Sequence, residues 1–156
     1  MYSNELICNI LTFLDTNINR RIEISELTSR FYYDRYYIMK LFKKELGITI
    51  TKYINQVRIY NSILDIRSNS YSLTRIALKN GFTSLEYFSE TFKQIMKVSP
   101  RIYQNYHLYR NKISEKDVYN IRDNLINLYD FLEKIKKYKT NRKPNTNPVL
   151  KRTIFK

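Results

Sequence analysis

The sequence predicts an all-α fold in which a pair of helices occurs twice and an amphipathic helix is added at the C-terminal side. Apolar residues recur at helical spacing through most of the 156-residue chain, between residues that commonly begin or end helices. The pattern of the first half returns in the second half. Only two glycines and three prolines are present, too few for a β fold rich in turns.

The first half predicts a helix over residues 5–18, a short helix over 26–32, and a longer helix that begins after Asp34. Ser25 is the expected N-cap of the short helix, because its hydroxyl can accept a hydrogen bond from a backbone N–H of the first turn. Gly47 supplies the left-handed residue that ends the longer helix.

A long helix over about 50–68 then joins the two halves. Its apolar side carries Ile54, Val57 and Leu64. In the second half, Ser72 begins a short helix that Gly81 ends, and Thr83 or Ser84 begins a longer one. Ser99 followed by Pro100 is a strong start for one more helix, because proline suits the first helical position.

The two halves repeat at an offset of 50 residues. The matched pairs are Tyr37 and Tyr87, Ile38 and Phe88, Phe42 and Phe92, Lys43 and Lys93, and Tyr53 and Tyr103. A repeat that covers both caps and apolar positions indicates a duplicated structural unit. We expect five aromatic residues to be buried core anchors: Tyr37, Phe42, Tyr87, Phe88 and Phe92.

The net charge of +14 indicates a polyanionic partner, either nucleic acid or an anionic membrane surface. No apolar run is long enough to span a membrane and no signal peptide is apparent, so we expect a cytoplasmic protein. Binding to a membrane surface is a third option that we do not expect, because the repeat and its helix caps describe a globular domain. His107 and Cys8, the sole histidine and cysteine, lie on different predicted helices. No glycine-rich phosphate loop or cluster of metal ligands occurs, so we expect no catalytic residue, cofactor or metal.

A short helix, a turn and a second helix form a helix-turn-helix, whose second helix can lie in a DNA major groove. Two such units reach successive grooves on one face of the duplex if their reading helices are about 34 Å apart. A joining helix of roughly 18 residues rises about 27 Å, at about 1.5 Å per residue, so this reach is plausible.

The stretch from Ile24 to Tyr103 resembles the AraC/XylS family of bacterial transcription regulators. The matching pieces are "SELTSRF", "YYIMKLFKKELGIT", "YINQVRI", "SLTRIALKNGF", "YFSETFK" and "VSPRIY". The resemblance implies seven helices, two of them reading double-stranded DNA, and control of transcription, usually activation by contact with RNA polymerase. The family often carries a separate effector-sensing domain, but we expect no room for one in this chain, so no small-molecule ligand is expected.

Matched by position, the resemblance places base-reading sites on both second helices. They are Arg35, Tyr36, Met39 and Lys40 in the first, and Leu85, Glu86, Ser89 and Glu90 in the second. Contacts to phosphate are expected from Lys43, Lys44, Lys93 and Arg101, and from the helix starts at Thr49 and Ser99. A glutamate can accept from cytosine N4 or repel phosphate, so the first helix is expected to carry most of the specificity.

Three residues depart from the family pattern. Lys97 stands where the first half has Gly47, so its helix must end without a glycine. Tyr32 replaces the common turn glycine. Asp65 lies where the family usually has an apolar residue, which suggests a shifted register for the joining helix.

The character of the chain changes after about residue 112. Apolar residues from Val118 to Ile135 follow an a/d heptad pattern, and a basic segment follows. The expected organisation is a DNA-binding domain over 1–110, an amphipathic helix over 111–139 and a flexible tail over 140–156. The helix over 114–139 can form a homodimer, fold back on the body, or hold another protein, in which case the chain is an adaptor for a second regulator or for RNA polymerase.

Overall fold

Eight α-helices make up the described part of the chain, residues 3–109 and 112–141 of this computed structural model. They are α1 (Ser3–Thr16), α2 (Ile24–Phe31), α3 (Arg35–Leu46), α4 (Ile50–Ser68), α5 (Leu73–Lys79), α6 (Leu85–Met96), α7 (Pro100–Leu108) and α8 (Glu115–Asn141). The predicted all-α class is confirmed. Most of the predicted basic tail, from residue 142 on, lies outside the described residues.

Most predicted helix starts are correct. The side chains of Asp34, Thr49, Ser72, Ser84 and Ser99 each accept a hydrogen bond from the backbone N–H three residues later, at 3.0 to 3.2 Å. The cap predicted at Ser25 is wrong, because α2 begins earlier and Glu23 is its N-cap. The backbone N–H of Glu23 donates to Oε1 of Glu26 at 2.9 Å, so the side chain of Glu26 satisfies a donor at the start of the helix.

A left-handed residue ends the second helix of each helix pair, α3 and α6. Gly47 has φ 75° and its N–H donates to the carbonyl of Lys43 at 2.8 Å. Lys97 takes the same role after α6, with φ 60° and a 2.9 Å bond to the carbonyl of Lys93. Tyr32 likewise adopts φ 60° in the turn after α2. The expectation that α6 ends without a glycine is therefore confirmed.

The helices enclose two hydrophobic cores. The first unit consists of α1, α2, α3 and the N-terminal half of α4, and the second unit consists of the C-terminal half of α4 with α5, α6 and α7. The ring centroids of Phe42 and Tyr53 are 5.9 Å apart in the first core, and those of Phe92 and Tyr103 are 5.8 Å apart in the second. The repeat predicted from the sequence is thus a repeat in packing.

Two of the five predicted anchors are not buried. Tyr37 and Tyr87 are each 40% exposed, whereas Phe42, Phe88 and Phe92 are fully buried. Each tyrosine immediately precedes the residue that points into its core, so it lies on the flank of the helix. Tyr37 stacks on Tyr33, and Tyr87 packs edge-on against Phe82.

Two of the three residues predicted on the apolar side of α4 pack inward, since Ile54 is buried and Val57 lies against the first core, but Leu64 does not. Leu64 is 45% exposed, because Ile63 fills the inward position beside it. Asp65 faces the polar end of α5, where it accepts hydrogen bonds from Lys79 at 2.7 Å and from Asn80 at 2.8 Å. These bonds explain why an acid is tolerated at this position.

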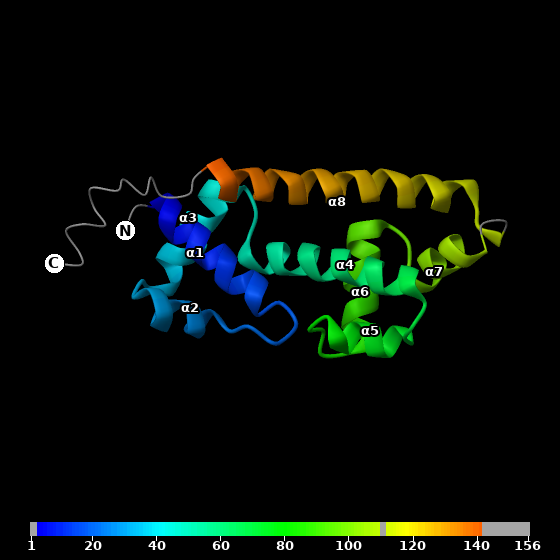
Figure 1. Cartoon of the computed structure of the whole chain (residues 1–156), viewed down its shortest axis with the longest axis horizontal. Coiled ribbons are helices and arrows are strands. Elements are labelled where there is room, and N and C mark those ends of the chain that lie inside the picture. Colours follow the sequence, from blue (N-terminus) through cyan, green and yellow to red (C-terminus); the bar gives the residue numbers. More distant parts are fainter. Residues whose placement is uncertain (1–2, 110–111, 142–156) are drawn as a thin grey trace.

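The long helix α8 lies against the body of the same chain. Figure 1 shows it running beside α4 in the opposite direction, from the α7 end of the molecule to the α1–α3 end. Ile121 and Leu128 are buried in the second core and Ile135 in the first. The heptad stripe is therefore used within the chain, as in the fold-back interpretation. None of the helices in the described residues has an apolar stretch that would cross a membrane.

Candidate nucleic-acid interface

The four base-reading candidates of α3 all lie on the surface. Tyr36 is 72% exposed and Met39 is 42% exposed, and Arg35 and Lys40 are exposed beside them. The ammonium of Lys40 lies 5.6 Å from the ring centroid of Tyr36, one helical turn away, which is a cation–π distance. This end of α3 therefore presents a phenol, a thioether and two cations to solvent.

The candidates of α6 form a different surface. Glu86 and Glu90 are exposed, and neither forms an ion pair with another described residue. Ser89 is half-buried, and Leu85 is half-buried because it packs on the second core. Glu86 lies in the first turn of α6, where a negative charge also stabilises the helix through its dipole. The two predicted readers thus differ in charge.

Four cations lie where contacts to phosphate were expected. Lys43 and Lys44 occupy the last turn of α3, Lys93 lies in the last turn of α6, and Arg101 is near the start of α7. All four are exposed, and none forms an ion pair with another described residue. Their charges are therefore available to an external anion.

The two helix starts differ in what they can offer an anion. The Thr49 hydroxyl accepts from the N–H of Lys52, and the Ser99 hydroxyl accepts from the N–H of Ile102. Thr49 is exposed, whereas Ser99 is half-buried and is followed by Pro100, which has no N–H to donate. The start of α4 is therefore the more exposed of the two and has one more backbone N–H to donate.

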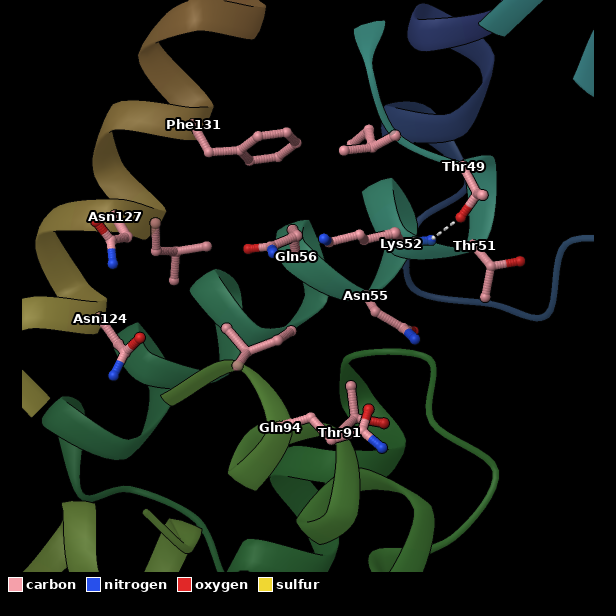
Figure 2. Close-up of a pocket in the computed structure, with 13 residues that line it drawn as sticks. Thr49, Thr51, Lys52, Asn55, Gln56, Thr91, Gln94, Asn124, Asn127 and Phe131 are labelled. Atoms are coloured by element: carbon pink, nitrogen blue, oxygen red, sulfur yellow. Dashed lines mark hydrogen bonds between the residues drawn. The ribbon is translucent and has the colours of Figure 1, made fainter. Parts of the chain in front are cut away.

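A cavity between α4, α6 and α8, lined by both polar and apolar side chains, was not predicted. It has a volume of about 590 Å³ and holds Lys52, close to Thr49 (Figure 2). Its polar lining is Thr49, Thr51, Lys52, Asn55, Gln56, Thr91, Gln94, Asn124 and Asn127. Lys52 is an exposed cation of the first turn of α4 that the sequence reasoning missed. Its place three residues after the capping threonine, Thr49, was the available signal.

Polar contacts join the helices of the first unit around α3. The Tyr53 hydroxyl donates to Oδ1 of Asp15 at 2.6 Å, which ties α4 to α1. Burial of Tyr53, and next the charge of Asp15, raise the pKa of its phenol. The guanidinium of Arg20 pairs with Glu26 at 2.7 Å across the α1–α2 connection, and this bond lowers the pKa of Glu26 to about 2.

In the described part of the chain, no three His, Cys, Asp or Glu side chains gather as a metal site would require. The shifts in pKa of the titratable side chains are instead explained by the burial and hydrogen bonds that hold the helices together.

This chain is similar to known proteins in sequence and in fold. A family described as a helix-turn-helix domain matches residues 27–106. The TetD protein of transposon Tn10, from Escherichia coli, is 29% identical over 114 residues, 73% of this chain and 79% of TetD. An uncharacterised HTH-type transcriptional regulator of Staphylococcus aureus is 27% identical over 142 residues, 86% of this chain and 19% of that protein.

Solved structures show the same fold. The DNA-binding domain of AdpA, determined in complex with a target DNA, superposes with a TM-score of 0.61 at 18% identity. The match covers 68% of this chain and 96% of the AdpA domain. This likeness establishes the architecture of the two units and their joining helix.

Proposed function

The chain belongs to the AraC-type helix-turn-helix family of DNA-binding transcription regulators, and we propose that it binds specific duplex sequences through α3 and α6 in two successive major grooves. Members of this family are regulators and not enzymes. The observation that carries the proposal is the duplicated packing, since Phe42–Tyr53 and Phe92–Tyr103 hold two reading helices in matching settings. The net charge of +14 favours a polyanion.

The two reading helices have unequal roles in this proposal. Lys40 can donate to guanine O6 and N7, and Tyr36 can contact a thymine methyl or a phosphate. Leu85 and Ser89 are half-buried, and Glu86 and Glu90 carry negative charge, so α6 docks more weakly unless a glutamate accepts from cytosine. The first helix therefore supplies most of the specificity.

Lys43 and Lys93 support this docking as equivalent phosphate contacts on the two units, with Lys44 and Arg101 beside them. The start of α4 at Thr49 adds backbone donors, and Ser99 adds fewer. Such contacts fix the register of the protein on the duplex without reading its sequence.

We also propose activation of transcription in the cytoplasm, with RNA polymerase as a partner. A homodimer through the heptad stripe of α8 would have to displace Ile121, Leu128 and Ile135 from the two cores. The alternative function, an adaptor that holds another regulator or the polymerase, is favoured by the outer side of α8, where Tyr119 is 67% and Ile126 is 59% exposed.

Selection from a pool of random DNA duplexes tests the proposal. The full chain is incubated with the pool in the presence of excess unrelated competitor, and the bound duplexes are sequenced over several rounds. A regulator enriches one operator with two conserved parts about one helical turn apart. An adaptor enriches no sequence, and this result would reject the proposed function.

A further inference from the structure

We propose that α8 is a brace that fixes the distance and rotation between the two reading helices, and so sets the spacing of half-sites that the chain accepts. This inference rests on the proposed reading of two grooves. It concerns a helix that lies outside the matched residues 27–106.

One end of the brace is attached to the second unit. Ile121 and Leu128 are buried in the second core. The side-chain amide of Asn124 donates to the carbonyl of Met96 at 3.3 Å, and Met96 is the last residue of α6. This part of α8 therefore holds the C-terminal end of the second reading helix.

The other end is attached to the first unit. Ile135 is 6% exposed in the first core. The hydroxyl of Tyr138 donates to Oε2 of Glu45 at 3.2 Å, in the last turn of α3, and Lys139 forms an ion pair with Asp15 on α1. The same helix thus holds the C-terminal end of the first reading helix as well.

The length of α8 between these attachments is fixed by helix geometry. Asn124 and Tyr138 are separated by about 21 Å, at about 1.5 Å per residue. The 27 residues of α8 include no glycine or proline, which are the usual causes of a sharp bend. Since α4 already joins the units on its own path, two helices side by side make a frame that resists bending and twisting better than α4 alone (Figure 1).

A rigid frame has a consequence for DNA recognition. Inserting one base pair between two half-sites moves the second by about 3.4 Å along the duplex and rotates it by about 34–36°. A braced pair of reading helices cannot follow that movement, whereas a pair joined by α4 alone can bend toward it. The brace therefore makes spacing part of the specificity.

The test compares two triple variants of the full chain that remove the same residue types. The uncoupled variant carries Ile135→Ala, Tyr138→Ala and Lys139→Gln. The control carries changes at exposed positions on the outer side of α8, Ile126→Ala, Tyr119→Ala and Lys137→Gln. Both variants lose one positive charge, so their nonspecific affinities stay comparable.

Each protein is titrated by fluorescence anisotropy with the operator enriched from the random pool and with the same operator carrying one inserted base pair. The full chain and the control should bind the inserted operator about tenfold or more weakly. The uncoupled variant should show a loss at least threefold smaller. Equal losses in all three proteins would overturn the role of α8.

Two further outcomes are also decisive. If the uncoupled variant does not fold by circular dichroism, the milder variant Tyr138→Phe with Lys139→Gln leaves Ile135 in place and should reduce the loss in the same direction. A pool that yields no two-part operator would reject the proposed function itself. Unchanged losses on a two-part operator would reject only the brace.

Discussion

Gly81 lies directly against Arg58. A Cβ atom at Gly81 would be 2.9 Å from Nε of Arg58 and 2.6 Å from the carbonyl oxygen of Ile18. Arg58 is 7% exposed, and its guanidinium donates to the carbonyls of Ile18 at 2.9 Å and of Arg20 at 2.7 Å. This buried cation on α4 holds the α1–α2 connection of the first unit against the turn after α5 in the second, which explains the glycine before Phe82.

Replacing Gly81 by alanine should destabilise the protein by about 2–4 kcal/mol, because the added methyl meets backbone and displaces Arg58 while φ is 86°. Gly47→Ala is the matched control, since Gly47 also has positive φ but nothing within 4 Å of the added atom. It should cost only about 1–2 kcal/mol, for the left-handed conformation. Urea unfolding measures both; equal losses would show that the contact with Arg58 does not matter.

The ion pair between Arg20 and Glu26 gives a prediction about pH. Its hydrogen bond lowers the pKa of Glu26 from 4.5 to about 2. A carboxyl whose pKa is lowered on folding adds stability above pH 4.5, and that contribution is lost as the pH falls through about 2. In Arg20→Gln the Glu26 pKa should rise toward 4.5, as measured by NMR titration of its side chain.

Arg21 supplies the control for that titration. It pairs with Glu23 at 3.1 Å on the same loop but does not touch Glu26. Arg21→Gln should leave the Glu26 titration unchanged. A Glu26 pKa that stays near 2 without Arg20 would mean that the backbone bond to Glu23 alone causes the shift.

Most helix ends could be predicted because their signals are local, although the start of α2 could not. Asp34, Ser84 and Ser99 cap helices by accepting a hydrogen bond from the backbone N–H three residues later. Lys97 ends α6 at the position that corresponds, in the 50-residue repeat, to Gly47 at the end of α3. The spacing of apolar residues predicts which side of a helix faces the core, but it does not predict where the buried surface ends. The exposure of Tyr37, which lies at the edge of that side, was therefore missed.

The place of α8 could not be predicted. A heptad stripe fits a second chain and the body of its own chain equally well, and only three-dimensional packing decides between them. The cavity around Lys52 was missed for the same reason, because three helices distant in sequence enclose it. The candidate readers were assigned from the resemblance to the AraC/XylS family, and the structure added that Leu85 and Ser89 are half-buried.

Lys40→Ala should relax selectivity at one base pair of the enriched operator by about 1–3 kcal/mol, because a donor to guanine is lost. The affinity of Lys40→Ala for an operator changed at that base pair should be almost the same as the affinity of the unchanged chain for that operator. The measurement is a set of anisotropy titrations over the four possible base pairs at each position. If selectivity is untouched at every position, the assigned face of α3 is wrong.

Lys43→Ala should weaken binding to all duplexes alike and reduce the slope of log affinity against log salt by about one, because one phosphate contact is lost. Lys93→Ala, at the equivalent place in α6, should behave in the same way. Lys116→Ala, an exposed lysine of α8, is the control and should leave the slope unchanged. An unchanged slope for Lys43→Ala would reject its contact with phosphate.

Hydroxyl-radical footprinting of the full chain on its enriched operator tests the central claim most directly, because it maps which backbone segments the protein covers. Two reading helices held in one frame should protect two segments about 10 base pairs apart on one face of the duplex. A single protected segment, or two on opposite faces, would contradict the account.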